Sequence, residues 1–330
     1  VNTWANTHPG IAFSMFPNHP ITADATPSEM AGASINSFWY FNNTGQVVTS
    51  TTGDQSLGIP ATQAGTPGAD INALNAWNLE PGSASTIVAV LDTGINYNGP
   101  DLINRVWDNT RDPWTNPAVP GGDGVDNDLD GVVDDYHGAN FSDTGAADDP
   151  MDDNGHGTLV SGLIAAQGNN AGAFVGVNWT AQILPVKVLD SAGSGSDASI
   201  LAGLNYVIEL KTLRGVNISV MNMSLGRAIV GPPNGVGDPG AAAIFDALDR
   251  VGQAGIITTV AAGNDGVSLS DFPQSPASSN NDLVVTVAAT DNRDNPTIFT
   301  NFGDQAKIAA PGQSIVGLGP DDGGSGTSFA

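Results

Sequence analysis

The feature that most constrains the fold is a series of apolar runs of strand length, spread over the second half and middle of the chain. The runs cover residues 85–91, 182–189, 218–224, 255–262 and 283–289. Such runs, without polar alternation, are typical of strands buried on both faces of a parallel sheet. Helical patterns at residues 70–77, 199–213 and 241–253 lie between them. Strands alternating with helices predict a three-layer α/β fold with a doubly wound, mostly parallel sheet.

The composition agrees with a folded, acidic protein. The chain has 330 residues, of which 40% are hydrophobic, enough to bury a substantial core. Its net charge of −25 would repel phosphate backbones, so we expect no nucleic-acid partner. There is no cysteine, which excludes disulfides and thiolate metal sites. No apolar run reaches transmembrane length, and we expect no membrane partner.

A histidine between two glycines is the most chemically suggestive stretch. It reads Asp152-Asp153-Asn154-Gly155-His156-Gly157-Thr158 and is followed by an apolar run of helical length at 159–166. Asp153 or Asn154 can cap this helix, which places His156 in its first turn. An imidazole there suits proton transfer near neutral pH. A histidine in a glycine-rich turn without a chemical role is the alternative that this stretch alone leaves open.

Two of the apolar runs end in polar residues that can reach a shared site. Asp92 follows the first run in Asp92-Thr93-Gly94, and Asn264 follows the fourth run after a glycine. The carboxyl ends of parallel strands are where open α/β sheets place their sites. Taken alone, either residue could instead serve a turn.

Four motifs in chain order carry a family resemblance. They are Asp92-Thr93-Gly94, Asn154-Gly155-His156-Gly157-Thr158, Ala261-Ala262-Gly263-Asn264 and Gly326-Thr327-Ser328-Phe329-Ala330. Together they resemble the motifs of subtilisin-like serine endopeptidases, the subtilases, over roughly residues 35–330, and the order Asp, His, Ser is that of subtilisin. The resemblance implies that Ser328 is the nucleophile, His156 its base and Asp92 the residue that orients the histidine. Asn264 would donate to the oxyanion.

The same resemblance implies a cleft for an extended peptide. Ser224, Leu225 and Gly226 resemble the strand to which the substrate adds, and Gly193, Ser194 and Gly195 resemble the strand on its other side. Ala261, Ala262 and Gly263 would form the opposite wall of the first specificity pocket. We therefore expect a peptide or protein substrate, a secreted monomer, and the protein's own propeptide as a further partner.

An acid-rich stretch at 123–135 predicts a cation site. Acids at alternate positions followed by glycine match the first half of an EF-hand-like calcium loop. We expect ligands from Asp126, Asp128, Asp130 and the Val132 carbonyl, with Asp134 or Asp135 closing the site. The twelfth position is His137 rather than Glu, so the loop is not a true EF-hand, and a solvated acidic loop is the alternative.

The resemblance supports calcium at this loop, because many similar subtilases carry an insertion between the Asp and His motifs. Asp101 and Asn170 match a second calcium site of the family, less closely because the spacing around Asn170 differs by one residue. We expect Ca²⁺ in a structural role at both places.

Two departures from the family pattern affect the interpretation. Leu159 stands where the family usually has histidine, outside the catalytic triad. The family's serine begins a long core helix, whereas this sequence ends two residues after Ser328. We expect residues 1–34 to be a propeptide remnant and linker, with a strand at 10–18, and 35–330 to be a catalytic domain that lacks its C-terminal part.

Three functions remain as hypotheses. The first is a serine endopeptidase, and the second is a catalytically silent subtilase-like interaction module or an inactive fragment. The third, an esterase of the α/β-hydrolase type, requires a G-x-S-x-G elbow before its acid and histidine. No such elbow precedes Asp92.

Overall fold

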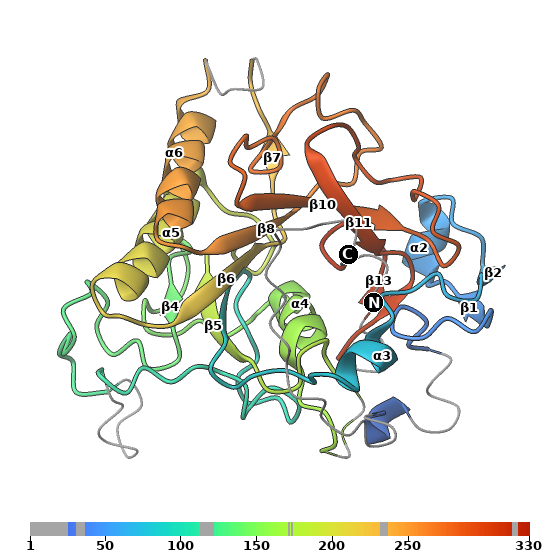
Figure 1. The fold of residues 1–330 in the computed structure, drawn as a ribbon. Helices are drawn as coiled ribbons and strands as arrows, with labels where there is room; N and C mark the ends of the chain where they lie inside the picture. The colour runs from blue at the N-terminus through green and yellow to red at the C-terminus, as the bar shows by residue number, and fades with distance from the viewer. Residues whose placement is uncertain are drawn as a thin grey trace, which may run out of the picture.

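The computed structural model describes residues 26–30, 37–112, 122–170, 172, 174–231, 237–318 and 323–330. Its centre is a seven-stranded sheet in which every neighbouring pair is parallel. The spatial order is β11-β10-β8-β6-β3-β5-β4 (Figure 1). These strands are β3 (Ile87–Asp92), β4 (Ala139–Asn140), β5 (Gln182–Lys187), β6 (Ile218–Met223), β8 (Ile257–Ala261), β10 (Val284–Thr290) and β11 (Ala306–Pro311).

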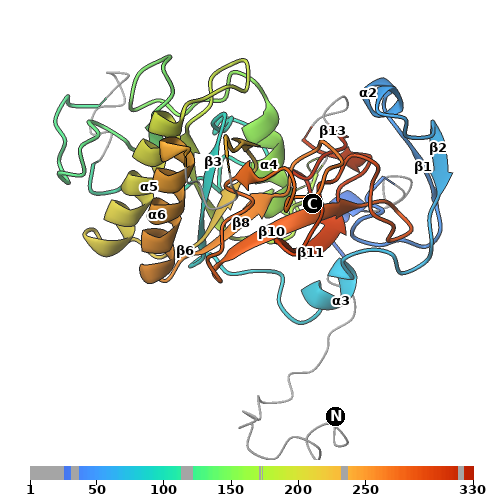
Figure 2. The same ribbon diagram turned by 90° about the horizontal axis from the view of Figure 1, so that it is seen from above.

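Helices cover both faces of this sheet. Helix α4 (His156–Ala165) lies on one face, and α5 (Asp197–Thr212) and α6 (Pro239–Gln253) lie on the other (Figure 2). The central strand β3 shows the division residue by residue. Ile87, Ala89 and Leu91 pack in one cluster with α5 and α6, whereas Val88 and Val90 pack with α4. The predicted three-layer, doubly wound α/β fold is confirmed, and β3 is buried on both faces because its side chains alternate between the two layers.

The connection through α4 has an unusual hand. The steps β4 to β5 and β5 to β6 cross the sheet in the same direction, yet their connecting helices, α4 and α5, lie on opposite faces. The two crossovers are therefore of opposite hand. Parallel crossovers are almost always right-handed, and α6 shares the face of α5, so the α4 crossover is the exception. This connection brings the first turn of α4 against the end of β3.

Short elements surround the sheet. They are η1 (Ser28–Met30), β1 (Val47–Thr49), α2 (Thr52–Ser56), β2 (Thr62–Ala64), α3 (Ala73–Trp77), β7 (Arg227–Ala228), β9 (Gln274–Ser275), β12 (Ile315–Val316) and β13 (Gly323–Gly324). Within the described residues, three two-stranded sheets are formed by the pairs β1-β2, β7-β9 and β12-β13. The expected helix at 70–77 corresponds to α3, and the expected strand at 10–18 lies outside the described residues.

Aromatic side chains join the early part of the chain to its late part. Residues 38–41 are all buried, in a cluster with Trp77, Phe174 and Trp179. Trp39 Nε1 donates to the Ser314 carbonyl at 3.3 Å, and Tyr40 Oη donates to the Val316 carbonyl at 2.8 Å. These contacts join residues 39 and 40 to residues 314–316 on the side of the sheet that α4 covers. Among the described residues, no helix combines the length and apolar character needed to cross a membrane.

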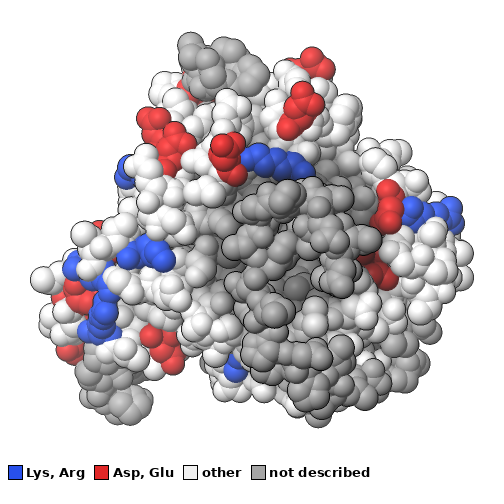
Figure 3. All heavy atoms as spheres, in the orientation of Figure 1, with Lys and Arg blue, Asp and Glu red and all other residues white. Residues whose placement is uncertain are grey.

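Lysine and arginine side chains are sparse on the surface. The whole chain has 9 of them against 34 Asp and Glu. On the face drawn in Figure 3, those of the described residues form only small, separate groups. The basic residues that the structure describes on this face therefore form no extended patch.

Candidate active site

The carboxyl ends of four neighbouring strands bring the predicted site residues to one edge of the sheet. Asp92, the last residue of β3, is in register with Lys187 at the end of β5. On the other side of β3, Leu91 pairs with Met223, the residue before Ser224. Met223 pairs in turn with Val260 of β8. Because all these strands are parallel, the residues that follow them lie side by side.

Asp92 and His156 form a hydrogen-bonded pair. His156 Nδ1 lies 2.8 Å from Asp92 Oδ1. The Asp92 side chain is fully buried, whereas 28% of the His156 side chain is exposed. Burial alone would lower the pKa of His156, but the hydrogen bond and charge of Asp92, with the charge of Asp152, raise it above the usual 6.5. With Nδ1 held by a carboxylate, Nε2 is the nitrogen left to meet a reacting group.

The first turn of α4 is held by Asp152, a residue that the sequence analysis did not single out. Its carboxylate accepts hydrogen bonds from the backbone N–H of Gly155 and Thr158, each at 2.9 Å, and from the Thr158 hydroxyl. Burial would raise the pKa of Asp152, but these hydrogen bonds hold it below its usual value. The N-cap is Gly155, at φ 107, which has no side chain to cap the helix.

The prediction that Asp153 caps α4 is wrong, because its carboxylate pairs with Lys187 Nζ at 2.6 Å. Asn154 contributes one bond at the helix start, accepting from the His156 N–H at 3.2 Å. The capping role therefore falls on the acid one residue earlier, Asp152, whose two oxygens reach three backbone N–H groups.

Thr93 links the end of β3 to this turn. Its hydroxyl donates to Asp152 Oδ1 at 2.9 Å and accepts from the Gly157 N–H at 2.9 Å. The approach is close enough to require glycine, since a Cβ at residue 157 would lie 2.2 Å from the Gly94 carbonyl oxygen. Thr93 and Gly157 therefore fix the distance between Asp92 and His156.

Lys187, at the end of β5, stabilises the same edge of the sheet through two hydrogen bonds. Its side chain is 2% exposed, and Nζ donates to the Thr93 carbonyl at 2.6 Å as well as to Asp153. A buried ammonium requires partners of this kind. The signal in the sequence is a single lysine inside an otherwise apolar strand run, which the sequence analysis passed over.

Ser328 lies in a segment that reaches both the groove and the histidine. The Phe329 ring centroid is 5.7 Å from that of His156. The Ser328 hydroxyl donates to the Ser224 carbonyl at 3.3 Å, and the Ser224 hydroxyl donates to the Ser328 carbonyl at 3.0 Å. Within the described part of the chain, no hydrogen bond joins Ser328 Oγ to His156. The structure thus brings Ser328 to the site with its hydroxyl directed at Ser224.

Asn264 is oriented by its contact with Thr327. Its Oδ1 accepts from the Thr327 N–H at 2.9 Å and from the Thr327 hydroxyl at 3.0 Å. An N–H group can face only the oxygen of the amide, so the orientation of the Asn264 side chain is determined by chemistry. The Thr327 hydroxyl in turn accepts from the Gly263 N–H at 3.0 Å. Asn264 Nδ2 is thereby left beside the Ser328 segment.

A groove of about 780 Å³ passes between the two predicted peptide-binding segments. One wall comprises residues 193–197 and the other residues 224–227, and Asn154 and His156 line the groove with them. Gly193, Ser194 and Gly195 therefore face the same space as Ser224, Leu225 and Gly226. An extended peptide can lie between two such walls and bond to both backbones.

The third predicted substrate segment lies elsewhere. Ala261 lines a separate apolar cavity of about 400 Å³, together with Ser224 and Ser328. Ala262 is fully buried, and Gly263 bonds to Thr327. Ala261, Ala262 and Gly263 are not among the residues that line the groove.

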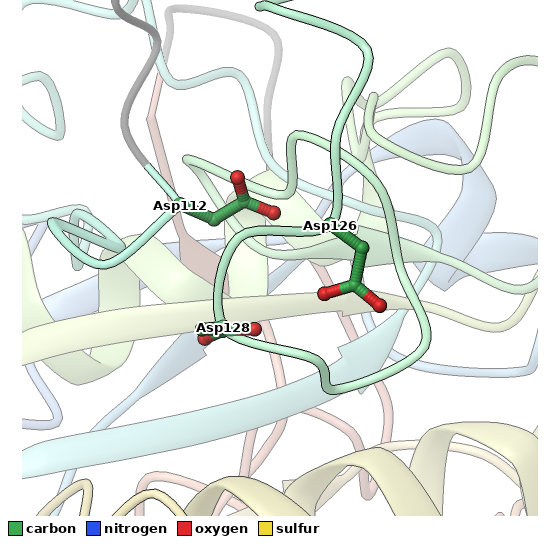
Figure 4. A group of neighbouring side chains, drawn as sticks. All are labelled: Asp112, Asp126 and Asp128. Carbon is green, nitrogen blue, oxygen red and sulfur yellow. The ribbon is translucent and has the colours of Figure 1, made fainter.

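Two carboxylates of the acid-rich stretch lie close to a third, that of Asp112, which precedes the stretch in the sequence. Ligand atoms of Asp112, Asp126 and Asp128 lie within 4.8 Å of one another (Figure 4). Asp112 is fully buried, and it precedes the motif in the sequence, so no spacing rule could have found it. Carboxylates this close repel one another unless a cation lies between them.

The remaining predicted ligands of this loop have other partners. Asp134 accepts from the N–H groups of Asp123 and Gly124, and Asp135 accepts from Asn109 and the Tyr206 hydroxyl. The Val132 side chain is buried in the core, and the role of its carbonyl as a ligand stays a prediction. Asp130 Oδ1 accepts from the Val132 N–H, but its Oδ2 is buried with no partner among the described residues. An orphaned buried carboxylate oxygen fits a site built to receive a cation.

The weaker calcium candidate forms a different cluster. Asn170 Nδ2 donates to Asp101 Oδ1 at 2.9 Å. Glu29 in η1, which the sequence analysis missed, accepts from the N–H groups of Asn169 and Asn170, each at 3.0 Å. A Cβ at Gly172 would lie 2.0 Å from Asp101 Oδ1 and 2.7 Å from Asn170 Oδ1, so this cradle of oxygens requires the glycine.

Fold and site together define a three-layer α/β protein with an aspartate-held histidine at the carboxyl edge of its sheet, beside a peptide-sized groove. Comparison with known families matches residues 83–330 to the subtilase family. The chain belongs to the subtilase family.

Relatives and a solved structure agree with this assignment. The chain is 39% identical to Subtilisin-like protease 7 of Trichophyton verrucosum over 58% of its own length and 43% of that protein. It is 32% identical to thermitase of Thermoactinomyces vulgaris, over 76% of its own length and 71% of thermitase. The structure of a cold adapted subtilisin-like serine proteinase superposes with a TM-score of 0.53 at 28% identity, covering 74% of this chain and 70% of that one. The chain thus spans less than half the length of the fungal relatives.

Proposed function

We propose that the protein is a serine endopeptidase that cuts peptide bonds through an acyl-enzyme. The observation that carries the proposal is the 2.8 Å bond between His156 Nδ1 and buried Asp92, with the Ser328 segment against the same ring. Membership of the subtilase family supports the same reaction. Two domain assignments stay predictions. They are the catalytic domain at residues 35–330 and the propeptide remnant and linker at residues 1–34.

In the proposed reaction Ser328 Oγ attacks the peptide carbonyl while His156 Nε2 takes the hydroxyl proton. The same proton then passes from His156 to the leaving amine, and water repeats the sequence to release the acyl group. Asp92 stays ionised, keeps the ring in one tautomer and stabilises the imidazolium.

The tetrahedral intermediate needs donors for its oxyanion. Asn264 Nδ2 is the side-chain donor, because Thr327 occupies the oxygen of the same amide. The Ser328 backbone N–H is the second. A donor of this kind contributes about 3–4 kcal/mol to the transition state, a magnitude established with a subtilisin.

We further propose a structural calcium ion at the acid-rich loop. Carboxylates of Asp112, Asp126 and Asp128 would hold it, and the unpartnered oxygen of Asp130 lies in the same loop. A second ion would be held by Asp101 and Asn170, with Glu29 close to them. Bound calcium would neutralise buried carboxylates and stabilise the folded loop. Secretion, a monomeric state and the propeptide as a partner stay expectations.

A catalytically silent subtilase-like module is the second candidate. One observation favours it, namely that the Ser328 hydroxyl bonds to Ser224 rather than to His156. Hydrolysis separates the two candidates. The gene product at its natural length should cleave an unstructured protein such as casein, and Ser328→Ala should abolish cleavage, while Ser56→Ala, at an exposed position in α2, should retain it. A folded protein that leaves casein intact would favour the silent module.

A further inference from the structure

Three segments of the candidate active site meet at the side chain of Lys187. Its Nζ donates to the carbonyl oxygen of Thr93, at the end of β3, and to Oδ1 of Asp153, in the loop before α4, each at 2.6 Å. Thr93 follows Asp92 directly, and Asp153 is three residues before His156. The ammonium therefore connects the strand that carries the acid with the loop that carries the base.

Lys187 also brings a positive charge to the side of the sheet that holds the Asp92 carboxylate. The two residues are Cα partners in the parallel pair of β5 and β3, and neighbouring strands lie about 4.8 Å apart. Val88 and Ile183, an earlier pair in the same register, both pack on the α4 side. Every second residue of a strand shares a face, so the side chains of Asp92 and Lys187 leave the sheet on the α4 side as well.

Among the residues that the structure describes, only one oxygen of the Asp92 carboxylate has hydrogen-bond partners. Oδ1 accepts from the Thr93 N–H at 2.7 Å and lies 2.8 Å from His156 Nδ1, whereas Oδ2 is buried without a partner. A buried carboxylate that is only partly hydrogen-bonded depends on positive charge nearby. Lys187, whose side chain is 2% exposed, supplies that charge from the neighbouring strand.

Asp153 is the counter-charge of Lys187, and its own side chain is 47% exposed. The titratable groups that surround the ammonium are Asp92 of β3, Asp152 and Asp153 of the loop, and His156 of α4. The Cα partner of Lys187 in β4 is the uncharged Asn140. Removal of either member of the pair of Lys187 and Asp153 therefore leaves one charge unbalanced close to the histidine.

The proton affinity of His156 responds to charges of this kind. Burial would lower its pKa, but the hydrogen bond and charge of Asp92, with the charge of Asp152, raise it. A further unbalanced negative charge stabilises the imidazolium and raises the pKa more, and an unbalanced positive charge has the opposite effect. While Lys187 and Asp153 neutralise one another, they add no net charge beside the ring.

We propose that Lys187 is a positioning residue of the proposed peptidase, whose ammonium ties the strand of Asp92 to the loop of His156 and neutralises the Asp153 carboxylate beside the histidine. The kinetic part of this inference rests on the proposed function. Loss of the ammonium should misplace the imidazole and slow turnover, because a shift of about 1 Å in a reacting group can cost on the order of a hundredfold in rate. Peptide binding should change little, since neither Lys187 nor Asp153 lines the groove.

The test uses charge-changing variants of the gene product at its natural length. Lys187→Met keeps the apolar stem, and it should lower kcat on the order of ten- to a hundredfold with KM within about twofold. It should also raise the pH midpoint of kcat/KM by about half a unit, and Asp153→Asn should lower the midpoint by a similar amount. The double variant should return the midpoint close to that of the wild type while kcat stays low. Lys307→Met is the matched control, because Lys307 of β11 also donates to carbonyl oxygens, those of Asn281 and Val284.

Midpoint shifts of opposite sign in the two single variants are a result that a purely structural role would not give. Midpoints that stay at the wild-type value in both, or that move in the same direction, would overturn the proposal. Wild-type turnover in a folded Lys187→Met would equally contradict it.

Titration of the His156 ring signals by NMR in a Ser328→Ala background gives the same comparison without catalysis. Opposite shifts there support the proposal even if the protein cuts nothing, and identical titration curves contradict it. If Lys187→Met does not fold, Asp153→Asn decides alone, because the amide oxygen of the new side chain still accepts from Lys187. A downward shift in that variant supports the role of the charge pair, and no shift contradicts it.

Discussion

Asp92 and His156 are 64 residues apart in the sequence and are joined by a 2.8 Å hydrogen bond at the carboxyl edge of the sheet. The pair exists because an exceptional crossover returns the chain through α4 to the end of β3. Thr93 then bonds to the Gly157 N–H and fixes the two backbones together. The catalytic proposal rests on this relationship, and the following predictions test its parts.

Replacing either member of the pair should affect turnover far more than binding. Asp92→Asn should lower kcat on the order of 10⁴-fold and His156→Ala by more, with little change in KM, because both act on the transition state. Steady-state hydrolysis of a chromogenic peptide measures both parameters. Asp304→Asn, at an exposed position, is the control. Near-normal turnover in His156→Ala would exclude His156 as the general base.

The pH dependence follows from the raised pKa of His156. Only the neutral imidazole accepts a proton from Ser328, so activity should rise with pH through a pKa above the usual 6.5. The sign for stability is the reverse. A raised pKa means that protonated His156 stabilises the fold below pH 6.5, and this contribution is lost as pH rises through the folded pKa. A rate that stays flat down to pH 5 would rule out this histidine.

Asn264→Ala should reduce kcat by about 10²- to 10³-fold with KM nearly constant, because it removes a donor that acts on the oxyanion. The same change also leaves the Thr327 N–H without its acceptor. Asn264→Asp keeps that acceptor, loses the donor and adds a negative charge beside the oxyanion, so it should lower kcat at least as much while unfolding at a temperature closer to the wild type. Equal activity in the wild type, Asn264→Ala and Asn264→Asp would show that Asn264 does not stabilise the oxyanion.

The Thr93 hydroxyl should matter for stability as well as for geometry. Thr93→Val keeps the shape but leaves the buried Gly157 N–H unpaired, which should lower the free energy of unfolding by about 1–3 kcal/mol. Thr93→Ser retains the hydroxyl and should behave almost as the wild type. Urea denaturation gives the comparison, and a Thr93→Val protein as stable as Thr93→Ser would show that these bonds contribute little.

Chelation should destabilise the protein if the acid-rich loop holds calcium. A ligand present at 100 times its Kd stabilises the native state by about 2.7 kcal/mol, so EDTA should lower Tm by several degrees. Asp112→Asn and Asp128→Asn should each remove most of this dependence, whereas Asp271→Asn should not. A melting curve indifferent to calcium and chelator in the wild type would argue for a solvated acidic loop.

Much of the sheet could be predicted because its strands are apolar throughout. Each of the five expected runs coincides with a strand to within one or two residues at most positions, and the strands are β3, β5, β6, β8 and β10. The two strands that the pattern missed lie at the sheet edges. β4 has only two residues, and β11 reads AKIAAP, whose lysine and exposed positions conceal its strand character. Edge strands need not be apolar on both faces, so periodicity cannot find them.

The candidate site was predictable only where a residue acts through its own chemistry. Asp92, His156 and Asn264 could be singled out because they follow strands or glycines in family motifs. Asp152, Thr93 and Lys187 could not, because their roles depend on contacts between segments that meet only in the fold. Asp112 and Glu29 escaped for the same reason, since each joins an acidic cluster from outside its motif.

The most direct test of the central claim is labelling with a fluorophosphonate probe, followed by peptide mapping. The probe forms a covalent bond only with a serine activated by a base. In the gene product at its natural length, we predict a single phosphonylated residue, Ser328, and no label in His156→Ala. A cooperatively folded protein that takes up no label, or a label on another serine, would contradict the assignment of Asp92, His156 and Ser328 as one catalytic unit.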